Sequence, residues 1–354
     1  MSPDTPLTEV GERRLLRHLR QRIPTGRGVL VGVGDDTAVL EMGPLVLATT
    51  DSMVEGVHFK RDWTPVRLLG RKALSRNLSD IGAMAGQPRH ALVSLCLPDD
   101  TTVGWVDGFY DGLLERAAEA GANVVGGNLS SSPGPIVIDV TLLGECVRPL
   151  GRAGGRPGDH LVVTGTLGAA ATGLRLLAQG ARLDETGELA HGGPWTETSM
   201  DVVSRCLRAQ LDPRPPLSFG RALGGQDIVH AGIDLSDGLS SDLLALCEAS
   251  GVSARLVAET LPVDPACAVL ERALGRDPLE QALHGGEDYE LLLAVPDEAW
   301  PTLLGLAGVW GLSLTRVGQL EEGSPGISIE TAGEARPLEP RSHEHFRAAT
   351  EPTE

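Results

Sequence analysis

Short acidic clusters follow apolar segments at five places in the 354-residue sequence, each beside Gly, Ser or Thr. They contain Asp35 and Asp36, Asp51, Asp80, Asp234 and Asp237, and Glu287 and Asp288. Carboxylates on turns at strand ends can converge on one crevice, where several together are stable only if cations neutralise them. Such oxygen ligands suit Mg²⁺ or Ca²⁺, and no His/Cys spacing typical of zinc accompanies them. The pattern predicts a magnesium site beside glycine turns whose N–H groups can bind a nucleotide triphosphate.

Each cluster taken alone has a simpler interpretation. Asp35 and Asp36 could cap a turn, and the DLSDG segment (234–238) could be an Asx turn before a helix. Arg76 and Asp80 could form a solvated i,i+4 pair. Because five clusters each place an acid at the end of an apolar run, we favour one shared site.

Familiar nucleotide-binding motifs are absent from the sequence. No G-x-x-x-x-G-K-[ST] segment occurs, which excludes a Walker-type ATPase. The GVGDDT segment has Thr37 where a dinucleotide fingerprint has its third glycine. The GTLGAAATG segment (165–173) could face an anion, but we favour packing of its small residues.

The composition restricts the partners and the location of the protein. With 30 Lys+Arg against 48 Asp+Glu the net charge is −18, which argues against nucleic acid as a partner. Only two of the basic residues are lysines, Lys60 and Lys72. The five cysteines lack any C-x-x-C pair, which favours reduced thiols. No apolar leader and no 18-residue apolar run occurs, so we expect a cytoplasmic protein without a membrane span.

Alternating helical and strand periodicities predict an α/β (α+β) protein of two domains. Helices are expected at 8–22, 64–85 and 101–120, and strands near 28–40, 45–51, 91–98, 123–128 and 136–145. In the helix at 64–85, Lys72, Arg76 and Asp80 share one side. The turn-rich GRAGGRPGD segment separates a first domain, residues 1–150, from a second, residues 151–354.

The second half repeats the alternation of strands and helices. Strands are expected at HLVVT, GID and ELLLAV, and helices at AAATGLRLLA and SSDLLALCEAS. Residues 181–230 show no clear pattern, and the acids and prolines beyond residue 320 predict a tail on the surface.

Seven segments in order resemble the thiamine-monophosphate kinase family, whose superfamily includes aminoimidazole-ribonucleotide synthetase and selenophosphate synthetase. They are GVGDDTAV, TTDSMVEGVHF, KALSRNLSDIGAMAG, VVGGN, GRAGGRPGD, IDLSDGLSSDL and GGEDYEL, and the resemblance covers residues 5–346. It implies ATP-dependent phosphorylation of thiamine monophosphate to thiamine diphosphate, which is the last step of thiamine diphosphate biosynthesis. The implied mechanism is in-line phosphoryl transfer, assisted by several Mg²⁺ ions and without a general base. The resemblance also implies a homodimer in which strands of the N-terminal domain form a barrel, and a C-terminal α/β domain that completes the cleft.

The resemblance assigns a role to each matched residue. The implied magnesium ligands are Asp36, Thr49, Thr50, Asp51, Asp80, Asn128, Asp234 and Asp237. The implied ATP contacts are Tyr110, Gly127, Asn128, Arg152 and Ser236, and the implied thiamine-phosphate contacts are His58, Glu287 and His343. Two positions depart from the family pattern, which usually has Asp in place of Asn128 and an aromatic residue in place of His343. An amide oxygen at Asn128 can still bind a hard cation, but without contributing charge.

Two other interpretations stay open. A superfamily relative is one, but selenophosphate synthetase normally has a reactive Cys or selenocysteine and a Lys close before the glycine-rich segment, and residues 1–34 contain neither. The other is a non-catalytic, acidic protein that binds Mg²⁺ or Ca²⁺, which would form no product from ATP and thiamine monophosphate.

Overall fold

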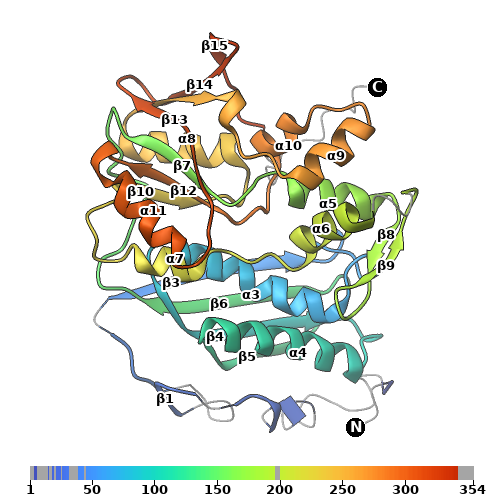
Figure 1. Cartoon of the computed structure of the whole chain (residues 1–354). Helices are drawn as coiled ribbons and strands as arrows, with labels where there is room; N and C mark the ends of the chain where they lie inside the picture. Colours follow the sequence, from blue (N-terminus) through green and yellow to red (C-terminus); the bar gives the residue numbers. More distant parts are fainter. Residues whose placement is uncertain are drawn as a thin grey trace.

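The computed structural model describes residues 4–5, 15, 18–19, 21–24, 26–31, 39–43, 45–195 and 200–341. Two mixed β-sheets lie at the centres of two halves, one sheet of four strands and one of seven (Figure 1). The last strand of the first sheet ends at Glu145 and the first strand of the second begins at His160. The prediction of a two-domain α/β chain is therefore confirmed.

The N-terminal sheet has the strand order β3–β6–β4–β5, with only β4 and β5 parallel. Its strands are β3 (Val46–Val54), β6 (Val137–Glu145), β4 (Gln87–Leu97) and β5 (Asn123–Ser131). Helices α3 (Val66–Ala83) and α4 (Val103–Ala120) pack against one face. A short antiparallel pair, β1 (Val29–Val31) and β2 (Val39–Leu40), precedes them. The helix expected at 8–22 lies mostly outside the described residues.

The local sequence explains the ends and the buried side of α4. The Thr102 side chain accepts a hydrogen bond from the Trp105 N–H at the first turn, and Gly121 ends the helix with φ 73°. Side chains of Phe109 and Leu113 are fully buried against the sheet. Such burial of apolar surface supplies most of the stability of the N-terminal half.

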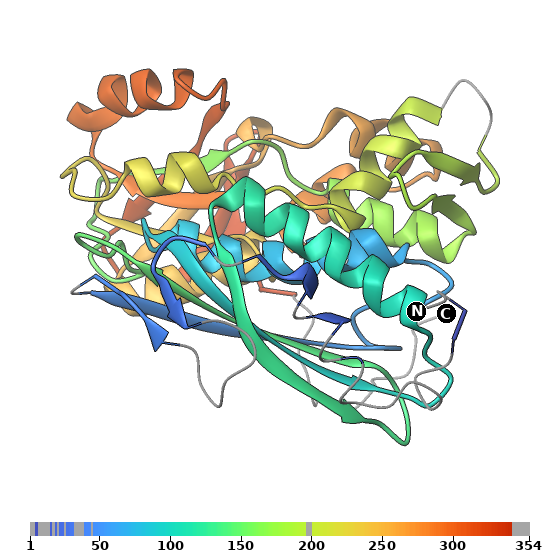
Figure 2. The ribbon, with the colours of Figure 1, turned by 90° about the horizontal axis from the view of Figure 1, so that it is seen from below.

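The other face of the N-terminal sheet, which we call the outer face, carries no helix among the described residues (Figure 2). It presents alternate residues of each strand, such as Thr50, Leu92, Asn128 and Asp139. Leu92 is 38% exposed there, whereas its neighbour Val93 on the helix side is fully buried. Because successive side chains of a strand point to opposite faces, this alternation also separates Thr50 from Asp51.

The C-terminal sheet has the order β10–β12–β7–β13–β11–β14–β15. Its strands are β10 (Ala231–Asp234), β12 (Leu291–Val295), β7 (His160–Thr164), β13 (Leu314–Glu321), β11 (Ser253–Val257), β14 (Gly326–Thr331) and β15 (Glu334–Pro337). The associated helices are α5 (Ala169–Ala178), α6 (Met200–Leu211), α7 (Leu217–Ala222), α8 (Leu239–Ser250), α9 (Pro265–Ala273), α10 (Pro278–His284) and α11 (Trp300–Gly308). Two single-turn 3₁₀ helices, Ala258–Thr260 and Asp297–Ala299, connect elements.

Two regions differ from the sequence-based expectation or add to it. The prediction of a surface tail beyond residue 320 is wrong for residues 326–331, because β14 pairs in parallel with β11 and buries Ile327 and Ile329. Residues 181–230, which showed no pattern, contain β8 (Ala181–Leu183), β9 (Leu189–Gly192), α6 and α7. Among the helices that the structure describes, none is long and apolar enough to cross a membrane.

Candidate active site

A cavity of about 470 Å³ lies between α3 and β3 of the first half and the turns and helices α5 and α6 of the second. Seven of the predicted site residues line it: Asp51, His58, Asp80, Asp234, Ser236, Asp237 and Glu287. An eighth, Thr49, donates from Oγ1 to Asp80 Oδ2 at 2.5 Å. Asp36 and His343 lie outside the described residues. Most of the carboxylates predicted to converge therefore lie around one space.

Two glycine turns hold the carboxylates of the second half. β10 ends at Asp234, and the segment that follows it packs against the GGED segment before β12. The Glu287 N–H donates to the Ser236 carbonyl oxygen at 2.8 Å. A Cβ at Gly286 would lie 2.8 Å from that same oxygen, and Gly238 has φ 107° with its Cβ position 2.9 Å from a carbonyl oxygen. Only glycine fits this close approach of two backbones.

Asp80 and Asp234 form the most acidic part of the cavity. Burial raises the pKa of Asp80 to about 7, and the nearby charge of Asp234 adds to the rise. Burial also raises the pKa of Asp234, although Ser79 Oγ donates to its carboxylate at 2.7 Å. Two buried carboxylates that repel each other favour either a shared proton or a cation between them.

The neighbouring turn continues this acidic region. Asp242, at the first turn of α8, accepts hydrogen bonds from the backbone N–H groups of Asp237 and Gly238, each at 3.1 Å. Burial raises the pKa of Asp242 to about 8, and the charge of Asp237 contributes. Asp242 therefore braces the loop that carries Asp237.

Glu287 also lines the cavity, in a dense hydrogen-bond cluster. Its Oε2 accepts from Lys72 Nζ at 2.9 Å and from Gln210 Nε2 at 2.6 Å. Its Oε1 accepts from the Tyr289 hydroxyl at 3.3 Å. Burial alone would raise the pKa of Glu287, but Lys72 lowers it, so the carboxylate is ionised. Both Glu287 and Tyr289 have positive φ, 67° and 52°, a strained backbone of the kind concentrated at functional sites.

Sequence reasoning missed the basic side of this site. Arg76 Nη2 lies 3.1 Å from Asp51 Oδ1, so Arg76 pairs across to β3 and not with Asp80 on its own helix. Lys72 is 2% exposed and pairs with Glu287. The i,i+4 spacing of Lys72 and Arg76 was the available signal, but their partners are distant in the sequence.

His58 is held beside the cavity by its own loop. The Val54 N–H donates to His58 Nδ1 at 3.0 Å, so Nδ1 is an acceptor and the neutral ring carries its proton on Nε2. Val54 is the last residue of β3, which also carries Asp51, and His58 lies in the turn that follows. The strand thus positions a carboxylate and an imidazole together.

Thr50 and Asn128 lie on the outer face of the N-terminal sheet. Thr50 Oγ1 is 3.2 Å from Asp139 Oδ1. Asn128 pairs with Ser94, which pairs with Asp139 across the sheet. Since β4 and β6 separate β5 from β3, the Asn128 side chain does not reach the cavity of its own chain, and neither does the Thr50 hydroxyl.

The remaining predicted ATP contacts are dispersed. Gly127 lies on the edge strand β5, where a Cβ would lie 1.8 Å from a backbone oxygen of β4. Tyr110 is 4% exposed and belongs to the N-terminal core, so it does not line the cavity. Arg152 does not line the cavity, although its charge opposes the rise in the pKa of Asp80 and of Asp234.

The donor chemistry of the cavity fits a hard divalent cation. Within the described part of the chain, no three His, Cys, Asp or Glu side chains already stand together as a metal cluster. Burial raises the pKa of Asp80 and of Asp234, nearby carboxylates add to the rise, and the charge of Arg152 offsets it only in part. Aspartate and threonine oxygens are ligands that Mg²⁺ accepts, together with water and substrate phosphates.

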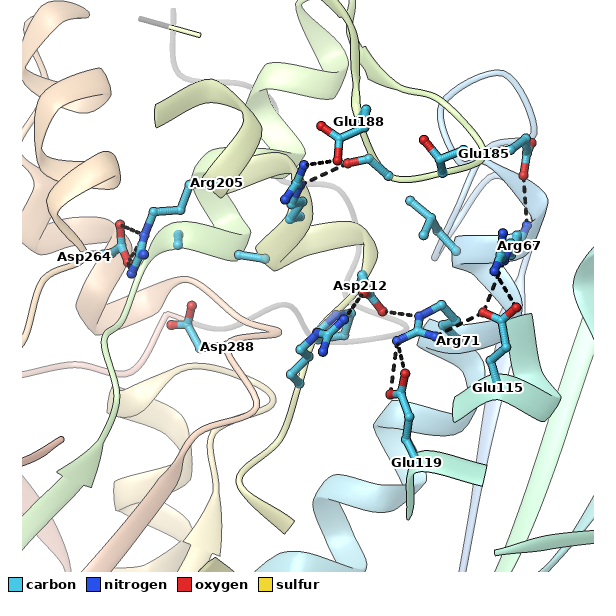
Figure 3. Close-up of a pocket in the computed structure, with 18 of the residues that line it drawn as sticks. Arg67, Arg71, Glu115, Glu119, Glu185, Glu188, Arg205, Asp212, Asp264 and Asp288 are labelled. Atoms are coloured by element: carbon cyan, nitrogen blue, oxygen red, sulfur yellow. Dashed lines mark hydrogen bonds and ion pairs between the residues drawn. The ribbon is translucent and has the colours of Figure 1, made fainter. Parts of the chain in front are cut away.

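A second cavity, of about 620 Å³, is lined by residues of α3, α4 and α6 and of the loops near them (Figure 3). Its charged side chains are largely paired with one another, as Arg205 is with Asp264 at 2.6 Å. Asp288 accepts a hydrogen bond from the Gly168 N–H at 2.8 Å, at the start of α5. This contact shows that the GTLGAAATG turn already holds a carboxylate of its own chain.

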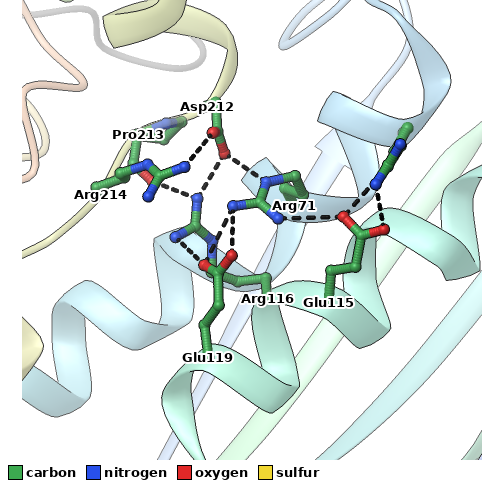
Figure 4. Close-up of polar contacts among 8 residues, drawn as sticks. Arg71, Glu115, Arg116, Glu119, Asp212, Pro213 and Arg214 are labelled. Carbon is green, nitrogen blue, oxygen red and sulfur yellow. Dashed lines mark hydrogen bonds and ion pairs between the residues drawn. The ribbon is translucent and has the colours of Figure 1, made fainter. Parts of the chain in front are cut away.

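A network at the edge of the second cavity joins the two halves (Figure 4). Asp212, after α6, accepts from Arg71 of α3 at 2.8 Å and from Arg116 of α4 at 2.5 Å. Glu119 accepts from both arginines, each at 2.9 Å. Because the two arginine side chains are 8% and 7% exposed, these pairs are shielded from solvent and hold α6 against the N-terminal helices.

Glu290 in the second cavity predicts a pH dependence of stability. Burial raises the pKa of Glu290 to about 7, while Thr164 Oγ1 donates to it at 2.5 Å. The folded protein keeps this proton between about pH 4.3 and pH 7 and the unfolded chain loses it, so stability falls by up to about 1.4 kcal/mol per pH unit over that window. Glu290→Gln removes this contribution and is more stable than the wild type at pH 8.

Chemical unfolding of both proteins at pH 5 and pH 8 measures the difference. The exposed Glu298→Gln variant is the matched control and follows the wild type at both pH values. Equal pH dependence in Glu290→Gln and the wild type would contradict the prediction.

Comparison with known proteins places these features in a family. Residues 34–146 match the N-terminal domain of AIR synthase related proteins, and residues 156–329 match their C-terminal domain. The thiamine-monophosphate kinase of Aquifex aeolicus (strain VF5) is 36% identical over 96% of this chain and 99% of its own. The crystal structure of thiamine-monophosphate kinase from Stenotrophomonas maltophilia K279a is 32% identical, with a TM-score of 0.75 over 92% of this chain and 96% of its own. The structure of AaThiL complexed with AMPPCP and TMP is 34% identical, with a TM-score of 0.73 over 98% of this chain and 100% of its own.

Both matched domains occur in one chain and in the same order as the two sheets, which defines an AIR synthase related protein. Within that class, the near full-length similarity is to thiamine-monophosphate kinases. The chain belongs to the thiamine-monophosphate kinase family, as the seven sequence motifs predicted.

Proposed function

We propose that this protein transfers the γ-phosphoryl group of ATP to the phosphate of thiamine monophosphate, giving thiamine diphosphate and ADP. The observation that carries the proposal is the cavity in which Asp51, Asp80, Asp234 and Asp237 face Glu287 and His58. Its carboxylates suit cation-bound phosphates, and Ala171, Leu174 and Val57 line the same cavity beside polar groups, which suits a heterocycle.

The chemistry requires charge neutralisation more than proton transfer. The nucleophile is an oxygen of a phosphate that is already ionised, so no general base is needed. Mg²⁺ ions, when bound, would offset the charges of the two phosphate chains and align them for in-line transfer. Asp80, Asp234, Asp51 and Asp237 would hold them, and Thr49 would keep Asp80 oriented through its 2.5 Å hydrogen bond.

The substrate and ATP roles of the other residues are part of the same proposal. Glu287 would face the cationic thiazolium or the aminopyrimidine, with His58 near the phosphate. Ser236 and Arg152 would contact ATP, and the charge of Arg152 lowers the pKa of Asp80. Asp36 and His343 keep the roles that the family resemblance implies.

We further propose a homodimer in which the outer faces of two N-terminal sheets form the barrel. The support is an uncovered face that carries Leu92 at 38% and Val46 at 50% exposure. Since Asn128 and Gly127 lie three strands from β3, a role for them in ATP or metal binding depends on such a second copy.

The domain boundary and the location are part of the same proposal. The two domains would divide at residues 150 and 151, and the five free cysteines support a cytoplasmic location.

A charge on the outer face tests the dimer. Leu92→Glu is expected to convert the dimer to monomers and to lower turnover, because burying an unpaired carboxylate costs several kcal/mol and weakens association about 100-fold or more. Sedimentation and size-exclusion chromatography with light scattering measure the mass. Val309→Glu, at a position 72% exposed in the other half, is the control and keeps the wild-type mass. A dimeric Leu92→Glu protein would contradict the barrel.

The activity itself is tested with purified protein, ATP, Mg²⁺ and thiamine monophosphate. We expect thiamine diphosphate and ADP in equal amounts, and no product when a chelator removes the metal. Bound ATP without product would instead support the non-catalytic, cation-binding interpretation. Turnover of a different phosphate acceptor in place of thiamine monophosphate would support another member of the superfamily.

A further inference from the structure

Arg76 has an unusual place in the cavity. Among the described residues that line it, Arg76 is the one arginine or lysine, against the carboxylates of Asp51, Asp80, Asp234, Asp237 and Glu287. Its side chain is 17% exposed, so water screens it poorly. An arginine so placed faces the space in which two phosphate-bearing substrates would meet.

The guanidinium has hydrogen-bonding capacity left over. Nη2 donates to Asp51 Oδ1 at 3.1 Å, whereas the buried Nε has no partner among the described residues. Glu287 does not need Arg76 as its partner, because Lys72 and Gln210 already donate to it. Since a guanidinium has five N–H donors in a fixed fork, Arg76 can bind an additional oxyanion.

We propose that Arg76 is a catalytic residue that binds the phosphate of thiamine monophosphate and then the transferred phosphoryl group. This inference rests on the proposed function. In this structure the guanidinium donates to Asp51, which in the proposed function would hold a cation and would then leave the guanidinium to the substrate phosphate. The exchange leaves a planar cation beside the phosphate oxygens, where bidentate hydrogen bonds give both orientation and charge stabilisation.

An alternative role for Arg76 is to position Asp51 alone. In that case, replacing Arg76 would weaken binding of any ligand that depends on the shape of the cavity, with or without a phosphate. A direct contact with phosphate instead affects thiamine monophosphate and spares thiamine. The effects of an Arg76 substitution on the affinities for thiamine monophosphate and for thiamine therefore distinguish a direct phosphate contact from a positioning role.

The experiment measures the affinities of thiamine monophosphate and of thiamine by calorimetry, with and without Mg²⁺, for the wild type and Arg76→Gln. We expect Arg76→Gln to bind thiamine as the wild type does and to lose about 10- to 100-fold in affinity for thiamine monophosphate, as for the loss of a charged hydrogen bond. Turnover falls as well. An unchanged preference for thiamine monophosphate, or an equal loss for both ligands, would overturn the proposal.

A second variant keeps the test decisive if Arg76→Gln does not fold. Arg76→Lys preserves the charge but not the planar fork, and we expect an intermediate loss of affinity that is again confined to thiamine monophosphate. If the wild type binds neither ligand and forms no thiamine diphosphate, the proposed function fails. If the wild type is active and both Arg76 variants keep its ligand preference, only the role of Arg76 fails.

Discussion

Asp80→Asn is expected to lower kcat by about a thousandfold while the metal-free protein becomes at least as stable as the wild type. Asp80 lies beside Asp234, and burial raises its pKa to about 7. The folded state therefore disfavours the ionised form, and stability is lost as the pH rises from about 4 through 7. An amide removes the repulsion and still accepts the hydrogen bond from Thr49. It also removes a charge that would bind the cation, so activity and stability change in opposite directions.

Steady-state turnover and thermal unfolding at pH 8, each with and without Mg²⁺, measure both effects. Mg²⁺ is expected to raise the melting temperature of the wild type more than that of Asp80→Asn. Asp99→Asn, at an exposed position outside the cavity, is the control and changes neither quantity. Near-normal turnover of Asp80→Asn would refute the proposed role of Asp80 as a cation ligand.

Lys72→Met is expected to lower the free energy of unfolding by about 3 kcal/mol, because it leaves the partly buried Glu287 carboxylate without its ion-pair partner. The Lys72 Nζ to Glu287 Oε2 distance is 2.9 Å, and Lys72 is 2% exposed. The double variant Lys72→Met/Glu287→Gln is expected to recover most of the loss, since no unpaired charge then remains. Affinity for thiamine monophosphate falls in the single variant, because Lys72 holds the Glu287 carboxylate in place.

The only other lysine provides the matched control. Lys60 is exposed, with its Nζ 4.0 Å from the centre of the Trp63 ring, so Lys60→Met costs about 1 kcal/mol or less. Urea unfolding of the four proteins measures the differences. If Lys72→Met were as stable as Lys60→Met, the Lys72–Glu287 pair would not hold the cavity together.

Local sequence patterns were sufficient to predict most of the secondary structure. The helical periodicity at 64–85 and 101–120 corresponds to α3 and α4, because their apolar residues recur on one face. The GGED and DLSDG segments were recognisable as turns that present carboxylates, since glycine there serves a local backbone requirement. The β14 strand was missed because prolines and acids flank a short GISIE alternation, and only its pairing with β11 makes it a strand.

Local sequence patterns could not predict the ion-pair and hydrogen-bond partners of the charged residues. Spacing along α3 suggested an Arg76–Asp80 pair, but Arg76 binds Asp51 and Asp80 accepts from Thr49. A long charged side chain can form ion pairs of similar intrinsic strength with several partners, and burial in the folded protein determines which of these ion pairs is formed. Similarly, the family resemblance implied a ligand role for Asn128, and only the strand order shows that Asn128 lies on the outer face.

The sequence by itself determined the family, the acid-rich chemistry and the glycine turns that carry it, because these depend on residue types at fixed local spacing. Only the tertiary structure decided which residues share the cavity. Strand register separates Thr50 from Asp51, and the packing of α3 on the second half brings Lys72 and Arg76 beside Glu287 and Asp51. Those contacts join residues between 25 and 215 positions apart, and their geometry follows from burial and sheet pairing, which no local pattern contains.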